Sequence, residues 1–542
     1  MCGEFSWRTP VAVVLLLHLL SMTGARAEDG LTLTNGGLRV VWNMRNGGLS
    51  SLSLVGDVDG MNWIEGCRTW GEMRAYEPTF EAKGPWHGHP MPYLTFKGLS
   101  RDGDAVVSRY ASGSLSVSVR RMLDASGLAE RYELTNTGGA PLSFLRGQFG
   151  ILATFNDSYG PAWECERLRC NAHIFAHGTN AYVHAVKMGP YPTDVVLDLT
   201  EGALDGYSQQ IDLRKGSNDR GDIVLHPAPF VLLAGETKTL AWRISSRPAG
   251  TFSPPVRVRY ETCFPGESFA VATRDGHVRS VRAERPGGLE TEGARLYVSE
   301  PLDELIRRRI DFIVSRQQCL DERSPLYGAF LIYDTEDRCV YFDNRWRDHN
   351  ASRERLGMGL LLARWLQTHD SARVRSALDL FERFVFREFV DRESGAVYDT
   401  IGKNPSFKRL YNAPWAITFL AELYRLKRDG SYLDTAERAI LDYYEKGGDR
   451  FYPNGCAFGE VIALLRESGR DVSAVLAAHR RHIDTLLKNG TDYPPHEVKF
   501  EQTIVTPAVR ILASYWLNVE RDPKVREAID RHVAVLTRFD GD

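Results

Sequence analysis

The sequence has no excess of charge of either sign. It contains 67 lysine and arginine residues against 70 aspartate and glutamate residues, which gives a formal net charge of -3. A chain without a basic field does not attract nucleic acid, and no run of acidic residues forms a tail. We therefore expect no nucleic-acid partner.

Apolar runs of membrane length are also missing. The run Val11–Leu20 follows Arg8 and precedes ARA at 25–27, a small-x-small cleavage pattern. A membrane span takes about 20 apolar residues, so this run is too short to be one. It predicts a signal peptide over residues 1–27 and a secreted or periplasmic protein without a membrane span after signal removal. A short N-terminal anchor is the alternative.

Cysteine is scarce, with 8 residues in a chain of 542. Cys2 leaves with the predicted signal peptide, and the odd number that remains cannot all pair within one chain. Cys165 and Cys170, in CERLRC, are either a local disulfide or two buried thiols. No spacing is typical of a zinc site, so we expect neither a metal nor a cofactor.

The first half of the chain has the pattern of antiparallel strands. Short alternating segments such as LRVVW at 38–42 are broken by Asn-Gly and Gly-Gly pairs up to about Ser246. This period of two, with its turns, predicts a β-sandwich, which we assign to residues 28–250. Residues 251–295, rich in proline, glycine and charge, predict a transition segment.

Beyond residue 295 the period becomes helical, and the expected helices come in pairs. The predicted pairs are 352–368 with 372–390, 412–428 with 432–445, 457–467 with 472–488, and 501–519 with 523–537. The links within the pairs are short. The links that precede the pairs are long: 319–351, 391–411, 446–456 and 489–500.

This alternation of links predicts how the helices pack. Antiparallel helix hairpins arranged around an axis place all short turns at one end and all long loops at the other. The fold class is therefore multidomain, β then α, with an (α/α) helical-hairpin toroid, complete or incomplete, over residues 296–542. A stacked superhelical repeat is the alternative, although no fixed-period signature occurs.

A β-sandwich followed by helical hairpins, with DHNASRERLGMG at 348–359, resembles the six-hairpin glycosidase superfamily. HEVKFEQTIVTPAV at 496–509 is similar to part of glycoside hydrolase family 154, which is associated with exo-acting β-glucuronidases. The resemblance implies an enzyme that removes a uronic acid from an acidic oligosaccharide or polysaccharide. Related helical toroids include uronate-directed lyases and epimerases, so the resemblance leaves the reaction open.

Carboxylates suited to glycoside hydrolysis occur in two of the long links. The reaction needs a proton donor and a second carboxylate. The candidates are Asp348, Glu354, Glu497 and Glu501. Glu354 is expected in the first turn of a helix, where the dipole favours its ionised form, and Glu497 and Glu501 are spaced i,i+4. The structural alternatives are a helix cap for Asp348 and a solvated charged face for the other pair.

Guanidinium and aromatic groups share the long links with these carboxylates. A guanidinium binds a sugar carboxylate through two parallel hydrogen bonds, which suits an acidic substrate. The predicted substrate-binding residues are Arg345, Trp346, His349, Arg353, Arg409, Tyr411 and Asn412. Trp415 is expected to pack its helix into the toroid wall, and Gly357 and Gly359 to mark close packing between helices.

Three functions are compatible with these residues. The first is an exported glycoside hydrolase, in which Asp348 or Glu354 pairs with Glu497 or Glu501. The second is a uronate polysaccharide lyase or epimerase, in which Tyr411 and His349 exchange the C5 proton. The third is a glycan-binding protein without catalytic activity.

Overall fold

The computed structural model describes residues 31–66, 68–75, 93–158, 160–210, 221–254, 256–257, 262–272, 277–291, 294–342, 352–405, 410–452, 455, 457–494 and 502–539. The chain forms two compact units. The first unit takes Met1–Asn156, Val195–Ile211 and Gly221–Ser246, and the second takes Asp157–Asp194, Asp212–Arg220 and Arg247–Asp542.

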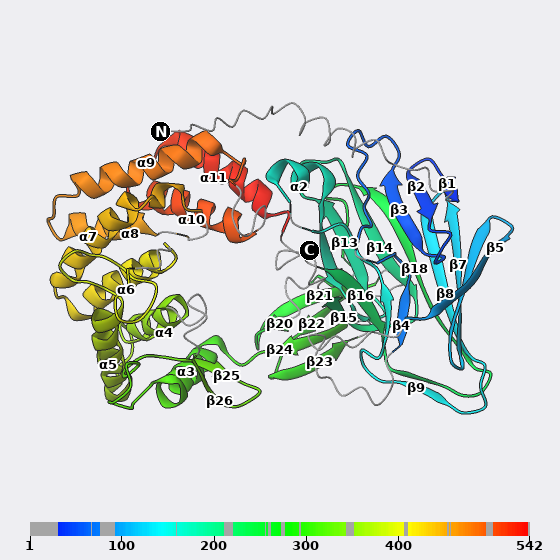
Figure 1. The fold of residues 1–542 in the computed structure, drawn as a ribbon, viewed down its shortest axis with the longest axis horizontal. Coiled ribbons are helices and arrows are strands. Elements are labelled where there is room, and N and C mark those ends of the chain that lie inside the picture. The colour runs from blue at the N-terminus through cyan, green and yellow to red at the C-terminus, as the bar shows by residue number, and fades with distance from the viewer. Residues whose placement is uncertain are drawn as a thin grey trace, which may run out of the picture. The chain divides into compact units, whose positions relative to one another are not determined.

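The first unit consists of antiparallel strands. These are β1 (Thr32–Thr34), β2 (Leu38–Trp42), β3 (Leu49–Leu54), β4 (Met73–Ala75), β5 (Thr95–Asp102), β6 (Ala105–Ser112), β7 (Leu115–Asp124), β8 (Gly127–Asn136), β9 (Leu142–Phe144), β10 (Phe149–Leu152), β14 (Thr193–Glu201), β15 (Leu204–Gln210), β16 (Asp222–Pro227), β17 (Phe230–Leu232) and β18 (Thr237–Pro248). The longest run of neighbours is β14-β18-β8-β7-β6-β5, and β15-β16-β10-β4 form a second run (Figure 1).

Alternation of side chains explains these sheets. Along β7 and β8, buried and less buried residues alternate, because successive side chains of a strand point to opposite faces. The buried face is closed by large side chains, among them Trp42, Trp63 and Trp242, each at most 1% exposed. The predicted antiparallel β region is therefore present.

The second unit begins with short elements. They are α2 (Ala162–Leu168), β11 (Cys170–Phe175), β12 (His177–Gly178), β13 (Tyr182–Lys187), β19 (Val256–Arg257), β20 (Thr262–Cys263), β21 (Ser268–Ala272), β22 (Val278–Arg282), β23 (Gly287–Thr291), β24 (Ala294–Val298), α3 (Leu302–Phe312), a π-helical turn (Ile313–Gln317), β25 (Ile332–Asp334) and β26 (Cys339–Tyr341). Cys165 and Cys170 are both buried and form no disulfide, so the expectation of two buried thiols is confirmed and the local disulfide is wrong.

Helices follow in the predicted pairs. They are α4 (Ser352–Trp365) and α5 (Ala372–Glu388), α6 (Asn412–Lys427) and α7 (Ser431–Glu445), α8 (Phe458–Glu467) and α9 (Ser473–Asn489), and α10 (Gln502–Asn518) and α11 (Pro523–Leu536). Each helix begins within one residue of its predicted start. Among the described residues, no helix is long and apolar enough to cross a membrane.

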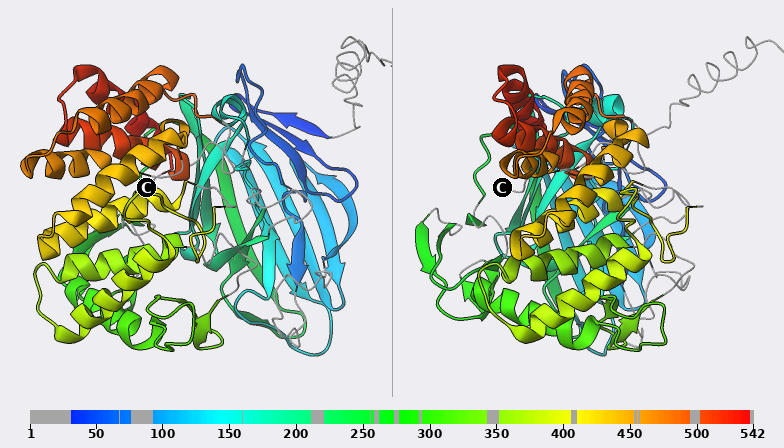
Figure 2. Two further views of the ribbon diagram at one scale, coloured as in Figure 1. Left: turned by 60° about the vertical axis from the view of Figure 1, so that its left-hand side comes forward. Right: turned by 90° about the vertical axis from the view of Figure 1, so that its left-hand side faces the viewer.

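These eight helices follow one another through the second unit from green to red in Figures 1 and 2. Successive helices alternate between two rows. In the even row, α4, α6, α8 and α10, each helix packs against the next. In the odd row, α7 packs on α9 and α9 on α11. The ends of the even row, α4 and α10, share no extensive contact in the described part of the chain.

Neighbours in the even row run parallel, as hairpins stacked side by side require. Along α4 and α6, Gly359 lies beside Phe419, and farther on Arg364 lies beside Glu422. The register advances in the same direction on both helices. In the same way, Gly455 before α8 meets Arg510 of α10, and Gly459 meets Ser514 four residues later.

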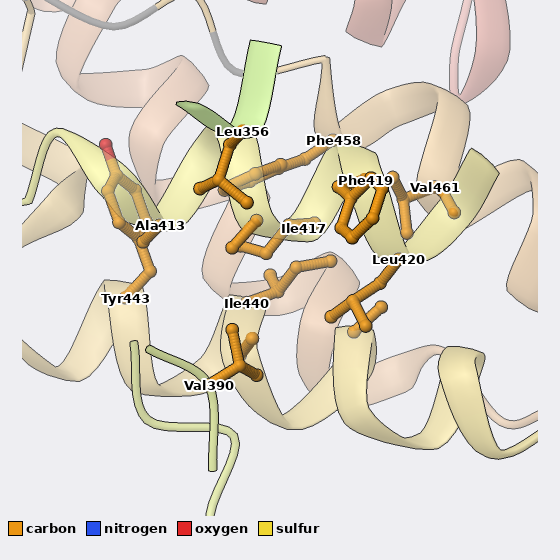
Figure 3. Packing of buried hydrophobic residues seen from close by; sticks show 14 of the residues in the cluster. Leu356, Val390, Ala413, Ile417, Phe419, Leu420, Ile440, Tyr443, Phe458 and Val461 are labelled. Carbon is orange, nitrogen blue, oxygen red and sulfur yellow. The ribbon is translucent and has the colours of Figure 1, made fainter. Parts of the chain in front are cut away.

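Burial differs between the rows for a physical reason. On α5 a stripe of buried residues recurs every three or four positions, at Val374, Leu378, Phe381, Val385 and Glu388, as in a helix packed mainly on one side. On α6 buried residues occur all round, because α4, α7 and α8 cover it. Figure 3 shows Ile417, Phe419 and Leu420 of α6 packed among side chains from these neighbours.

Two buried histidines, His479 and His482, lie on α9 beside Tyr444 of α7. The Tyr444 hydroxyl is 2.7 Å from Nδ1 of His479 and 3.3 Å from Nδ1 of His482. Burial, together with the neighbouring His482, lowers the pKa of His479 to about 3. Burial lowers the pKa of His482 to about 4. Both imidazoles are therefore neutral in the folded protein at neutral pH.

Acidification from pH 7 to pH 5 is expected to destabilise the protein through this pair. The unfolded chain protonates these histidines near pH 6.5, whereas the folded chain does not. Their contribution to stability is complete above pH 6.5 and is lost as the pH falls towards 4, by roughly 2 kcal/mol for each histidine at pH 5. Denaturant titrations at several pH values measure the slope.

The variant His482→Leu is expected to reduce the slope of the free energy of unfolding against pH, whatever its stability at pH 7. His369 is exposed, so His369→Leu is expected to leave the slope unchanged. An unaltered slope in His482→Leu contradicts the neutral state of His482 in the fold.

Candidate functional site

A cavity of about 250 Å³ lies against the even row of helices. Residues from α4, α6 and α10 and from the segment before α8 line it: Leu360, Arg364, Pro414, Trp415, Thr418, Gly455 and Arg510. The cavity is therefore built by residues that are far apart in sequence and that belong to helices of one row.

A stripe along α6 faces this region. Trp415 and Thr418 line the cavity, Tyr411 lies one turn before Trp415, and Glu422 one turn after Thr418. Positions i, i+4, i+7 and i+11 fall on one face of a helix. The Trp415 side chain is 37% exposed, although the residues on both sides of it are buried. An indole that is half open to a cavity offers a flat apolar surface to a ring.

Two guanidinium groups border the cavity. Nε of Arg364 donates to Oε1 of Glu422 at 3.0 Å, and the side chain is 51% exposed. Arg510 is exposed, and its stem runs past Gly455, where an added Cβ would lie 2.7 Å from Cδ of Arg510. Among the described residues, no carboxylate pairs with Arg510. Such a cavity favours an anionic ligand.

Most of the predicted site residues lie outside the described residues. These are Asp348, Glu497, Glu501, Arg345, Trp346, His349 and Arg409. Arg353 and Glu354 are in the first turn of α4, and only their backbone is described. The segments that carry these residues directly precede α4, α6 and α10, the helices that line the cavity. Their roles stay predictions.

Two predicted residues are described, and both lie at the start of α6. The Tyr411 ring meets the Phe451 ring edge-on, with centroids 4.9 Å apart. Asn412 is buried, and its side-chain amide donates to the Tyr398 carbonyl at 3.2 Å and to Oδ1 of Asp399 at 3.1 Å. Asn412 therefore ties the preceding link to the helix, and a substrate contact for it stays a prediction.

None of the seven lining residues was among the predicted site residues, and three of them have charged or aromatic side chains: Arg364, Trp415 and Arg510. Trp415 was expected in the wall; its indole lies 3.6 Å from the position of a Cβ on Gly357 of α4, and it also borders the cavity. Trp415 follows Tyr411 by four residues, which places both on one face of a helix, and this spacing could have identified Trp415 as a site residue. Arg364 and Arg510 carry no such signal, since their position depends on how α4 and α10 are rotated within the row.

No family model matches the chain, and a search of curated proteins finds no similar sequence. Among solved structures, one described as a polysaccharide lyase matches with a TM-score of 0.78 at 24% identity, covering 94% of this chain and 83% of that chain. A galactose mutarotase-like protein from Lactobacillus casei ATCC 334 covers 40% of this chain and 100% of its own, at 14% identity. Its TM-score of 0.26 is too low to indicate a shared fold. The chain therefore shares the fold of a glycan-degrading enzyme over most of its length.

Proposed function

We propose that this protein is an exported enzyme that cleaves an acidic polysaccharide beside a uronic acid, by β-elimination. The observation that carries the proposal is the cavity, with Arg364 and Arg510 for a carboxylate and Trp415 for the face of a sugar ring. The likeness of the fold to a polysaccharide lyase supports elimination over hydrolysis. The four hairpins belong, in this proposal, to an incomplete (α/α) toroid.

The proposed reaction breaks one C–O bond. A guanidinium that binds the uronate carboxylate stabilises the negative charge that develops when a base removes the C5 proton. The electron pair of the C5–H bond forms the C4–C5 double bond. The C4–O bond then breaks, and its oxygen takes up a proton from an acid. Tyr411 and His349 are the proposed proton-transfer groups, Tyr411 because it shares a helix face with Trp415.

Hydrolysis by a glucuronidase-like enzyme is the second candidate. It rests on the carboxylates of the segments that directly precede or begin α4 and α10: Asp348, Glu354, Glu497 and Glu501. One of them is proposed as the proton donor and another as the nucleophile or water-activating base.

Digestion of a panel of acidic glycans separates these candidates. We suggest alginate, polygalacturonate, hyaluronan and heparosan, with products followed by ultraviolet absorbance and mass spectrometry. Elimination gives an unsaturated uronate that absorbs in the ultraviolet, whereas hydrolysis gives a saturated sugar with the mass of one added water. If the protein binds a glycan but releases no products, the result supports a glycan-binding protein. If the protein shows no binding and no products, the proposal is refuted.

The variant Arg510→Met is expected to lower kcat/KM about tenfold to a hundredfold, the range for losing a hydrogen bond to a charged group. Methionine keeps an apolar stem beside Gly455, so the fold is expected to be retained. The control is Arg526→Met on α11, an exposed arginine paired with Asp530 and absent from the cavity lining. Equal activity of Arg510→Met and the wild type contradicts a role for this cavity.

A further inference from the structure

A buried carboxylate lies at the end of the α6 stripe. Glu422 is 3% exposed, and it accepts three hydrogen bonds from side chains. Its Oε1 accepts from Nε of Arg364 at 3.0 Å and from a terminal nitrogen of Arg425 at 2.8 Å. Its Oε2 accepts from Nε2 of Gln367 at 2.8 Å. Arg364 belongs to α4, Glu422 and Arg425 belong to α6, and Gln367 lies in the turn directly after α4.

The hydrogen bond to Nε determines which end of the Arg364 guanidinium is left for a ligand. Arginine has five N–H donors, one on Nε and four on the terminal nitrogens. Glu422 takes the one on Nε. In the described part of the chain, no hydrogen bond involves the terminal nitrogens of Arg364. These nitrogens belong to a side chain that borders the cavity, and they form the fork that matches a carboxylate.

The rest of the network keeps Glu422 in place. A buried carboxylate is stable when charged partners and hydrogen bonds satisfy it, and here Arg364, Arg425 and Gln367 do so. Gln367 approaches from the turn that follows α4, three residues beyond the cavity-lining Arg364. The carboxylate is therefore fixed between the two helices and does not adapt to a ligand.

We propose that Glu422 is a positioning residue for substrate recognition: it orients Arg364 so that the terminal nitrogens of its guanidinium bind the carboxylate of a uronate in the cavity. This inference rests on the proposed function, because it assumes that the cavity takes an acidic sugar. Glu422 itself contacts Arg364 and not the sugar. A helix-packing role alone requires the same buried carboxylate, but it predicts no effect on substrate affinity.

The variant Glu422→Gln tests the proposal because it keeps the size of the side chain. The amide has one acceptor oxygen, and its nitrogen is a donor that repels the donors of an arginine or glutamine. The assay uses the glycan of the panel that the wild type cleaves fastest. In Glu422→Gln, KM is expected to rise about tenfold, and this factor is expected to be larger than the factor by which kcat falls. Glu422→Asp, which keeps the charge and withdraws it by one methylene, is expected to give an intermediate rise.

A matched control lies on α5. Glu382 is 8% exposed and also binds three side chains, Lys427, Tyr432 and Arg392, none of which lines the cavity. The variant Glu382→Gln is expected to lose stability and to keep the KM of the wild type. Thermal unfolding of each variant shows how much protein is folded in the assay.

A double-variant cycle decides whether Glu422 acts through Arg364. If it does, Glu422→Gln adds no further rise in KM to Arg364→Met. Additive effects overturn the proposal, as does a wild-type KM in Glu422→Gln, or an equal rise in Glu382→Gln. Failure of the proposed function is distinct: the wild type itself then cleaves none of the acidic glycans, or it handles a carboxyl-reduced form of its substrate equally well.

Discussion

Replacement of Arg121 by methionine is expected to lower the free energy of unfolding by about 3–5 kcal/mol, the range for leaving a buried charge without its partner. Arg121 on β7 and Glu130 on β8 form an ion pair in which both side chains are 0% exposed. Denaturant unfolding monitored by tryptophan fluorescence measures the change, because buried tryptophans surround the pair.

The surroundings of Glu130 make this loss large. Its Oε2 accepts from Nε1 of Trp70 at 2.8 Å and from Nε1 of Trp242 at 2.5 Å. Arg121 also donates to the Gly47 carbonyl at 2.9 Å. Without the guanidinium, two indole donors remain to the buried carboxylate among the described residues, and the carbonyl loses a donor. An uncompensated buried charge is strongly destabilising.

The adjacent residue of the same strand provides the control. Arg120 points to the opposite face, is 44% exposed, and pairs with Asp102, which is 68% exposed. Exposed ion pairs contribute about 0–1 kcal/mol, so Arg120→Met is expected to change stability by no more than that. Replacing both partners, Arg121→Met with Glu130→Leu, is expected to recover part of the loss. Equal effects of Arg121→Met and Arg120→Met contradict a buried pair.

The variant Gly359→Ala is expected to destabilise the protein by about 1–3 kcal/mol, the cost of overpacking a filled core. A Cβ at Gly359 would lie 2.2 Å from Cε1 of Phe381 and 3.2 Å from Cε2 of Phe419. Phe381 cannot move aside easily, because it is fully buried and its ring stacks on that of Phe330, with centroids 4.6 Å apart. Thermal and denaturant unfolding measure the loss.

Gly357, two positions before Gly359 on α4, is the matched control. Among the described residues, a Cβ there would meet only Cζ3 of Trp415, at 3.6 Å, which is an ordinary contact. Alanine favours a helix over glycine by roughly 1 kcal/mol, so Gly357→Ala is expected to be neutral or stabilising. If both variants were stabilising, the approach of α4 to α5 and α6 would be looser than the structure shows. The close packing predicted at these glycines is thus confirmed for Gly359.

Local patterns were enough to locate the secondary structure. The start of each helix from α4 to α11 follows from a change of period and from short polar links, which act over a few residues. The buried ion pair also follows a local rule: Arg121 continues the inward positions of Val117 and Val119, and Glu130 those of Leu128 and Tyr132. The pattern predicts inward charges, but it does not say that they meet.

The candidate site depended on long-range packing. The sequence indicated carboxylates and arginines in the segments that precede α4 and α10, and Tyr411 at the start of α6. It did not indicate Arg364 and Arg510, because both lie within regular helices, where a charged residue usually faces solvent. Only the parallel packing of α4, α6 and α10 brings their guanidinium groups to one cavity.

The sequence by itself determined the order of strands and helices, because hydrophobic period, turn residues and link lengths act within a few residues of the chain. The tertiary structure decided which faces of these helices meet. The rotation of each helix is set by contacts such as Gly359 with Phe381 and Glu422 with Arg364, whose partners lie 22 and 58 residues apart. Such contacts depend on the whole row of helices, and a local pattern contains no information about them.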